Sequence, residues 1–214
     1  NYKFTWNPRN VVLAGQGNAQ FIRNNKYKYI PYNSLFTRLE EMEILDQGTF
    51  EAYSNRDSLS YRKSYGIDNI PTIYRGTLRK VGYSEAWNVF VKLGMTDDTY
   101  KVRNVESLTW REFINSFLVF HKSKTVEQKL IEKLSIDDKI MDKLRWLGIL
   151  DDELVGMSEG TPAQILQKLL ESKWSLEEND KDMVIMQHHF SYTLAGKKEN
   201  LKSSLVIKGK DQLH

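Results

Sequence analysis

The sequence predicts an α+β protein, with a mixed β-sheet, flanking helices and a helical insertion. Three observations predict this class. Residues 1–96 alternate strand and helix patterns, residues 97–175 are amphipathic with repeated helix-start signals, and residues 176–210 have the pattern of one long β-hairpin. A hairpin this late in the chain most simply rejoins the sheet begun near the N-terminus, so the helical stretch is expected to interrupt that sheet.

The first two strands are expected on either side of Asn24 and Asn25. Residues 21–23 and 26–30, which are largely apolar or aromatic, flank this pair. Asparagine tolerates the positive φ of a two-residue hairpin turn, so the pattern predicts a β-hairpin. Pro31 then ends the second strand, because proline lacks the N–H that a strand interior needs.

A helix is expected next, capped by Asn33. Apolar side chains follow the cap at helical spacing, at Leu35, Phe36, Leu39 and Met42. Residues 49–53 predict another strand. Residues 72–79 alternate and predict a further strand, with Arg75 and Arg79 on the same face.

Two more helices are expected before residue 96, and a glycine marks the end of each. Asp57 can cap a short helix that runs to Tyr65 and ends at Gly66. Ser84 can cap a longer one that ends at Gly94.

Residues 97–175 are expected to be almost wholly helical. Three pairs have the spacing of a capping box and each precedes an amphipathic segment: Thr109 with Glu112, Thr125 with Gln128, and Thr161 with Gln164. No heptad persists, so the segments predict a packed subdomain rather than a coiled coil. The final hairpin is expected to turn at residues 195–197, between two stretches that alternate apolar and polar side chains.

Composition excludes several classes of protein. The chain has 214 residues and no cysteine, which rules out a disulfide scaffold, a thiolate zinc site and a cysteine nucleophile, and fits a cytoplasmic location. No apolar run is long enough to span a membrane. A net charge of +3, from 31 basic and 28 acidic residues, does not suggest a nucleic-acid partner. The absence of an initiator methionine suggests a piece of a longer protein.

Most patterns that resemble functional motifs have a structural explanation. Gly15-Gln16-Gly17 lacks the third glycine and the following helix of a dinucleotide site, so we interpret it as a tight turn. His188 and His189 point to opposite faces of a strand and are not expected to share a metal ion. We therefore predict no metal site, and no catalytic residue is assigned.

The arginines are more informative. Arg9, Arg56, Arg75 and Arg79 lie in strand or turn contexts, and the fixed charge and planar fork of arginine suit carboxylates. The alternative is that these arginines are exposed on strands and only increase solubility. Residues 55–58 (NRDS) combine donors and an acceptor at a helix start, which fits either a ligand site or a helix cap with an internal Arg–Asp pair. The residues themselves thus predict an α+β domain able to bind an anionic small molecule.

Several segments together resemble the saccharopine dehydrogenase family, in its glutamate-forming saccharopine reductase branch. They occur in family order along nearly the whole chain: residues 5–15 (TWNPRNVVLAG), 55–58 (NRDS), 75–79 (RGTLR) with 82–83 (GY), 146–148 (WLG), 182–188 (DMVIMQH) and 203–206 (SSLV). No single segment is decisive, but the combination is specific.

The resemblance covers only the second domain of that family, so residues 1–214 are expected to form a substrate-binding and dimerisation domain. Its expected parts are an α/β part at 1–96, a helical insertion at 97–175 and the rejoining hairpin at 176–210. The family's Rossmann domain, which binds NAD or NADP, is expected to be absent, so no cofactor is expected on this chain. The missing Rossmann domain of the same polypeptide and a second copy, in a homodimer, are the expected protein partners.

The resemblance also implies site residues. Arg9 matches the family arginine that binds a substrate carboxylate, and Ile30, Pro31 and Tyr32 match a segment that lines the substrate. Asn55, Arg56 and Asp57 are further candidates for the same cleft. Arg75 and Arg79 are expected instead to hold the domain together or to reach the dimer interface.

The implied reaction is oxidoreduction between saccharopine, a lysine–glutamate adduct with three carboxylates, and glutamate plus aminoadipate semialdehyde, in lysine metabolism. The isolated chain is expected to be inactive. Two alternatives stay open: a non-catalytic dimerisation or regulatory module on the same scaffold, and a dehydrogenase for another amino-acid adduct.

Overall fold

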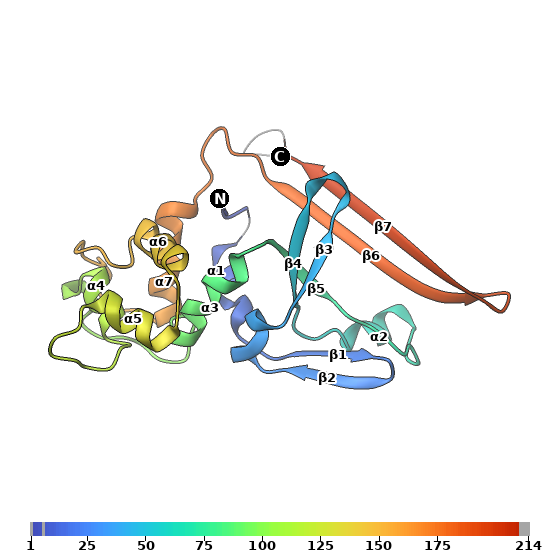
Figure 1. Ribbon diagram of the computed structural model, residues 1–214, viewed down its shortest axis with the longest axis horizontal. Helices are drawn as coiled ribbons and strands as arrows, with labels where there is room; N and C mark the ends of the chain where they lie inside the picture. The colour runs from blue at the N-terminus through green and yellow to red at the C-terminus, as the bar shows by residue number, and fades with distance from the viewer. Residues whose placement is uncertain (1, 6, 210–214) are drawn as a thin grey trace.

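A computed structural model describes residues 2–5 and 7–209 of the chain. The helices α4, α5, α6 and α7 gather at one end of an elongated molecule, and the strands lie toward the other (Figure 1). The α+β class with flanking helices is therefore confirmed. The strands form three small antiparallel sheets, ordered β1-β2, β3-β4-β5 and β6-β7, rather than one mixed sheet. No helix in the described ranges is long and apolar enough to cross a membrane.

The N-terminal segment begins with a short helix and a hairpin. Helix α1 (Pro8–Val12) is capped by the side chain of Asn7 and continues into a 3-10 turn, η1 (Leu13–Gly15). Strands β1 (Ala19–Arg23) and β2 (Lys26–Ile30) pair in antiparallel register. Their turn is the predicted one, since Asn24 and Asn25 have φ values of 53° and 61°. Pro31 follows β2 directly and precedes the next turn.

The prediction of a helix after Asn33 is wrong. Residues Tyr32–Thr37 form a 3-10 turn, η2, and Leu39–Glu43 form strand β3, which pairs with β4 (Thr49–Ser54). Leu35 and Phe36 are buried, but Leu39 is exposed. Only the first half of the apolar pattern therefore faces the core, and pairing with the next strand, β4, overrides the helical spacing of the second half.

Strand β5 (Gly76–Lys80) is shorter than the predicted strand over 72–79. Before Gly76 the chain bonds to a different sheet, because Ile73 exchanges two backbone hydrogen bonds with Ile22 of β1. From Gly76 onward the partner is β4, with Ser54 opposite Gly76. The segment thus ties two sheets together instead of extending one.

The two expected helices before residue 96 form, although neither has the predicted residue at its N-cap: Leu59 takes that position in one and Gly82 in the other. Helix α2 (Ser60–Tyr65) follows Asp57, whose Oδ1 accepts from Leu59 N at 2.7 Å, and ends at Gly66 in the left-handed region. Helix α3 (Tyr83–Leu93) ends at Gly94 as predicted.

Ser84 does not cap α3; it lies inside the first turn. The buried carboxylate of Glu51 on β4 accepts from the backbone N–H groups of Gly82 (3.0 Å) and Ser84 (2.5 Å) instead. A carboxylate suits this position because the N-terminus of a helix carries partial positive charge.

Four helices occupy the predicted helical stretch, separated by connections of different length. They are α4 (Trp110–Asn115), α5 (Val126–Leu134), α6 (Asp138–Leu147) and α7 (Pro162–Trp174). All three predicted capping boxes form, before α4, α5 and α7. A short 3-10 turn, η4 (Val105–Ser107), lies before α4, and long loops precede α5 and α7, so the stretch is less helical than expected.

The core of this region comes from the inner faces of the helices. Phe113, Met141 and Leu144 are among the most deeply buried of these side chains. Aromatic contacts join the N-terminal segment to α7: Phe4 lies edge-on to Trp174 at 5.4 Å, and its N–H donates to the carbonyl of Trp174 at 2.7 Å.

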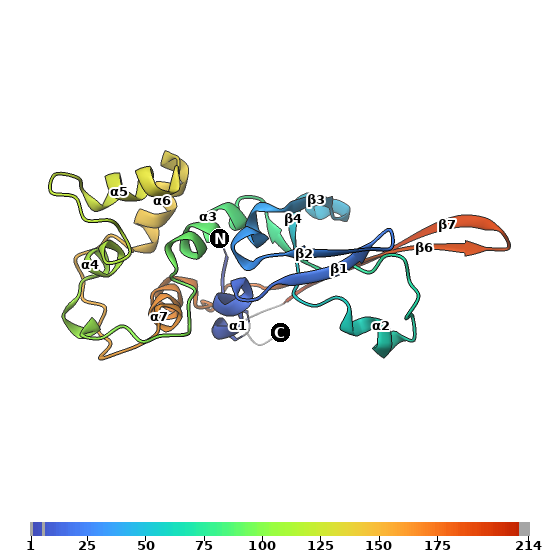
Figure 2. The same cartoon turned by 90° about the horizontal axis from the view of Figure 1, so that it is seen from below.

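The C-terminal strands β6 (Met183–Leu194) and β7 (Lys197–Lys208) pair along their whole length, around a turn at Ala195 and Gly196. They do not rejoin the N-terminal sheet. Each of the two strands forms its backbone hydrogen bonds with the other strand of the hairpin. The hairpin projects away from the helical end of the molecule (Figures 1 and 2). Trp6, in the first family segment, and residue 210, the predicted hairpin end, lie outside the described residues.

Candidate functional site

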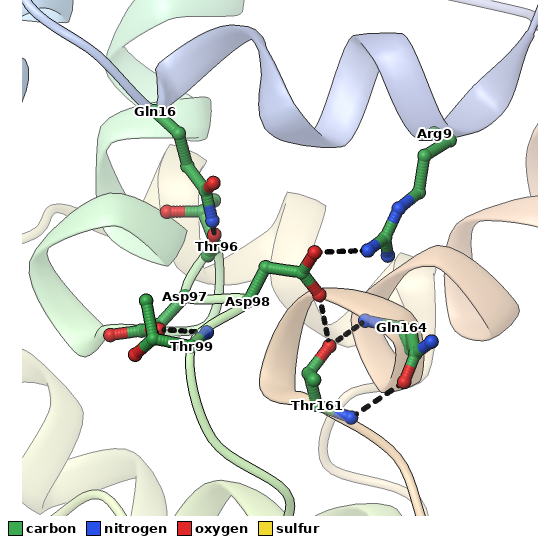
Figure 3. A network of polar contacts seen from close by, with 8 residues as sticks. All are labelled: Arg9, Gln16, Thr96, Asp97, Asp98, Thr99, Thr161 and Gln164. Atoms are coloured by element: carbon green, nitrogen blue, oxygen red, sulfur yellow. Dashed lines mark hydrogen bonds and ion pairs between the residues drawn. The ribbon is translucent and has the colours of Figure 1, made fainter.

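Three polar side chains contact the segment 96–98, which follows α3, and two of them belong to predicted site residues. Arg9 of α1 forms an ion pair with Asp98, and Gln16 donates to the carbonyl of Thr96. The hydroxyl of Tyr32 lies 3.2 Å from the hydroxyl of Thr96. Figure 3 shows α1 passing over this segment, with α7 beside it. Two of the predicted site residues, Arg9 and Tyr32, are thereby brought to the same short segment.

Local sequence explains why residues 96–98 are fixed. Gly94 ends α3 with φ 86°, and the next residues turn toward the start of α7. Asp97 closes this turn, since its Oδ1 accepts from the N–H of Thr99 at 2.7 Å. Thr96 is fully buried. The carboxylate of Asp98 is left to face Arg9 and α7.

Asp98 connects Arg9 to the N-terminus of α7. One of its oxygens accepts from Nη2 of Arg9, and the other accepts from Thr161 Oγ1 at 2.5 Å (Figure 3). Thr161 is also the N-cap of α7. Partial burial acts to raise the pKa of Asp98, but the hydrogen bonds from Thr161 and Arg9 outweigh it and hold the pKa below its ordinary value. Asp98 is therefore ionised at neutral pH.

Arg9 is only partly satisfied by this partner. Its Nη1 is buried and has no hydrogen-bond partner among the described residues. Arg9 also lines a cavity of about 620 Å³ that continues along α7. A guanidinium with one nitrogen anchored and another unpaired is suited to bind an incoming anion.

The other residues of the 30–32 segment have different surroundings. Ile30 is buried in the core and Pro31 is exposed. The N–H of Tyr32 donates to Asn18 Oδ1 at 3.3 Å, which fixes the start of η2 against the loop before β1. Of the three, Tyr32 is the residue that contacts segment 96–98.

Residues 55–57 form a separate group beside β1. The carbonyl of Arg56 accepts from Gln20 N at 2.9 Å, and the N–H of Asn55 donates to the carbonyl of Arg75 at 2.8 Å. Arg56 has φ 39° and an exposed side chain. Asp57 Oδ1 accepts from the N–H groups of Leu59 (2.7 Å) and Ser60 (3.4 Å) in the turn before α2, but the N-cap position itself is Leu59. No hydrogen bond or ion pair within the described ranges joins this group to Arg9.

Arg75 and Arg79 make contacts inside the domain. Arg75 lies 4.0 Å above the ring of Tyr61 and donates to the carbonyl of Asp57 at 3.5 Å. Arg79 lies 5.2 Å from the ring centres of both Tyr2 and Tyr83. Burial raises the pKa of Tyr83, so this tyrosine stays neutral beside the arginine. Both arginines pack as cation–π pairs.

The whole chain matches a known family. Residues 1–213 match the family model described as the saccharopine dehydrogenase C-terminal domain. The chain belongs to this family. The resemblance found in the sequence segments is thereby confirmed.

The relatives of this saccharopine dehydrogenase domain are longer proteins. A saccharopine dehydrogenase (NADP(+), L-glutamate-forming) of Schizosaccharomyces pombe is 34% identical over 221 residues, which cover 97% of this chain and 48% of the relative. The mitochondrial alpha-aminoadipic semialdehyde synthase of Rattus norvegicus is 33% identical over 216 residues, 97% of this chain and 23% of that protein. The chain thus spans about half and about a quarter of their lengths.

A solved relative has the same fold. The apo saccharopine dehydrogenase (L-Glu forming) of Saccharomyces cerevisiae matches with a TM-score of 0.81 and 29% identity, over 98% of this chain and 49% of that one. The fold read from the sequence as the family's second domain therefore agrees with a solved member of the family.

The turn at Gly15–Gly17 has a structural role, as the sequence indicated. The turn at Gly15–Gly17 leads into strand β1 and not into a helix, so no helix N-terminus is there to receive a pyrophosphate. All the strand pairs among the described residues are antiparallel, whereas a Rossmann domain is built on parallel strands.

The two neighbouring histidines are engaged separately. His188 stacks on Phe190 at 5.8 Å, and His189 Nε2 lies 2.7 Å from Gln187 Oε1. Within the part of the chain that the structure describes, no group of three or more His, Asp or Glu residues is placed to bind a metal ion.

The sequence did not predict that Asp98 and Gln16 belong to the site, and it predicted Thr161 only as a helix cap. The signal for Asp98 is weak, because Thr96-Asp97-Asp98 reads as an ordinary polar loop. Only the fold shows that α1, η2 and α7 meet there.

Proposed function

We propose that this chain is the substrate-binding part of a saccharopine dehydrogenase-like oxidoreductase, in which Arg9 binds a carboxylate of saccharopine. The observation that supports it is the state of Arg9: one guanidinium nitrogen is anchored on Asp98, and Nη1 is buried and unpaired next to a cavity. An unsatisfied buried donor is costly, and a ligand carboxylate would remove that cost.

Tyr32 is proposed to share this site, since its hydroxyl bonds to the same 96–98 segment. Ile30 and Pro31 would shape the wall behind it. Asn55, Arg56 and Asp57 are proposed as a second part of the cleft; the exposed Arg56 side chain and its fixed backbone support this. Since two fungal relatives carry NADP(+) in their names, NADP is the proposed cofactor, bound outside the described residues.

Calorimetry of saccharopine binding to the full-length protein tests the role of Arg9. Arg9→Ala is expected to weaken binding by about 1.5–3 kcal/mol, the typical contribution of a hydrogen bond to a charged group. Because the substitution also leaves Asp98 unpaired, Arg9→Lys is measured as a second variant and should retain part of the affinity. Arg103→Ala, at an exposed arginine, is the matched control. Equal affinity of wild type and Arg9→Ala would remove the proposed role.

A homodimer is proposed as well, and the C-terminal hairpin supports it. One face of β6-β7 carries apolar side chains that are each about half exposed, including Val184, Met186, Phe190 and Leu205. Each strand also has one edge without a strand neighbour in the described ranges. An isolated two-stranded hairpin is marginal in water, so a partner that covers this face stabilises it.

Sedimentation of the full-length protein tests the dimer. Leu205→Lys places a charge in the apolar face and is expected to weaken self-association by more than about tenfold. Thr193→Lys adds the same charge to the opposite, polar face and should have little effect. A monomeric wild type would contradict the proposal.

The two alternatives are separated by the same experiments. A protein that dimerises but binds no saccharopine fits a non-catalytic module, whereas binding of a different adduct fits a related dehydrogenase. The division at residues 96/97 and 175/176 and a cytoplasmic location stay predictions. Limited proteolysis and cell fractionation test them.

A further inference from the structure

The cavity beside Arg9 extends well beyond Arg9 itself. It has a volume of about 620 Å³ and runs between α1, the 157–160 loop and one face of α7. Small-molecule sites typically occupy about 300–1,000 Å³, so the cavity is large enough for an extended organic anion. Its α7 wall belongs to the helical region, to which no binding role has been assigned.

The polar face of α7 that lines the cavity is regular. Gln164, Gln167, Lys168 and Glu171 follow each other at i, i+3, i+4 and i+7 and line it together. The opposite face of α7 is buried in the core through Ile165, Leu166, Leu169 and Leu170. Because that face packs in the core, the helix that carries the polar side chains has a fixed position beside α1.

Two of the cations that line the cavity, Arg9 and Lys168, form no ion pair with a carboxylate that lines it. Of the two lining carboxylates, Glu159 pairs with Lys101, and Glu171 accepts from Gln167 Nε2 at 2.8 Å. Lys168 has no carboxylate partner among the described residues; its ammonium donates only to the carbonyl of Gly156, at 2.7 Å. Arg9 contributes the unpaired Nη1.

Gln164 lines the same cavity as these two cations. Its side-chain oxygen is used by the N–H of Thr161 at 2.8 Å, which leaves the amide NH₂ as the end that a ligand can meet. In Figure 3 the lower guanidinium nitrogen of Arg9 points toward the turn of α7 that carries Gln164. Donors from two different elements thus border one cavity.

We propose that this cavity is an anion-binding site shared between α1 and α7, in which Lys168 is a second substrate cation beside Arg9 and Gln164 is a neutral donor. The inference rests on the proposed function and extends it, because it assigns substrate contacts to the helical region. A ligand with two or more separated carboxylates fits best: Arg9 presents a planar fork and Lys168 a point charge, and each binds one carboxylate.

Calorimetry of the full-length protein tests the site with two probes, saccharopine and glutarate, a simple dicarboxylate without an amine. Lys168→Met is expected to lower the affinity for saccharopine about tenfold or more. Lys168→Arg keeps the charge and should recover most of it. Lys173→Met removes the same charge from an exposed position of α7 that does not line the cavity, and should change the affinity less than about twofold.

The outcomes separate this inference from the proposed function. If saccharopine binds in an Arg9-dependent way but Lys168→Met behaves like wild type, the shared site is wrong and the function of Arg9 stands. If glutarate binds in a Lys168-dependent way and saccharopine does not bind, the anion site stands and saccharopine is not its ligand. If neither probe binds the wild-type protein, the shared site is overturned.

Discussion

The helical body (α4 to α7) buries most of its apolar side chains, whereas the C-terminal hairpin (β6 and β7) leaves many of its apolar side chains exposed. Phe113 of α4 is fully buried against its neighbours, whereas Phe190 of β6 is 48% exposed, although both lie on regular elements with well-formed turns or caps. The helices cover one another, but the hairpin pairs with no other strand among the described residues, and apolar side chains on one of its faces stay about half exposed. Correct local structure therefore does not by itself complete a core, which is why we propose a partner for the hairpin.

The largest expected effect separates these two regions. Phe113→Ala should lower the free energy of unfolding by about 3–5 kcal/mol, because it opens a cavity in a packed core. Phe190→Ala should change it by less than about 1 kcal/mol in the monomer, since half of this side chain already faces water. Urea unfolding at low protein concentration measures both. Equal losses would show that the hairpin is packed as tightly as the helical body.

A smaller loss of stability is expected at Asp98, which joins α1 to the start of α7. Asp98→Asn should destabilise the protein at neutral pH by about 1.5–3 kcal/mol, since the charge that Arg9 and Thr161 contact is lost. Asp152→Asn, which breaks an exposed ion pair with Arg111, is the control and should cost less than about 1 kcal/mol.

The pH dependence of the Asp98 effect follows from its lowered pKa. A carboxylate whose folded pKa lies below its unfolded value stabilises the fold fully above the unfolded value, here 3.8, and loses that contribution as the pH falls through the folded pKa. The difference between wild type and Asp98→Asn should therefore be constant above about pH 5 and shrink below about pH 4. A difference that persists unchanged in acid would mean that Asp98 acts through shape rather than charge.

Local chemistry made much of the fold predictable. The turn at Asn24 and Asn25, the capping boxes and the glycine helix ends depend on residues only a few positions apart, and all of them form. The errors involve partners outside the short segment in which each pattern lies. The strand β3 replaces a helix because β4 pairs with it, and Glu51, 33 residues before Ser84, supplies the cap for α3.

The residues of the candidate site likewise differ in how far the sequence could predict them. Arg9 and Tyr32 were indicated by the family resemblance, which carries information about distant contacts that spacing alone does not. Asp98 had no such signal, because its importance depends on α1 and α7 meeting at one loop. Lys168 looks like any solvent-exposed helical lysine until the cavity beside it is seen.

The most direct test of the substrate-binding role is a crystal structure of the full-length protein with saccharopine. A ligand carboxylate is expected within hydrogen-bond distance of Arg9, with Asp98 still bonded to Thr161. A structure in which saccharopine binds elsewhere, and Arg9 contacts only Asp98, would contradict the account.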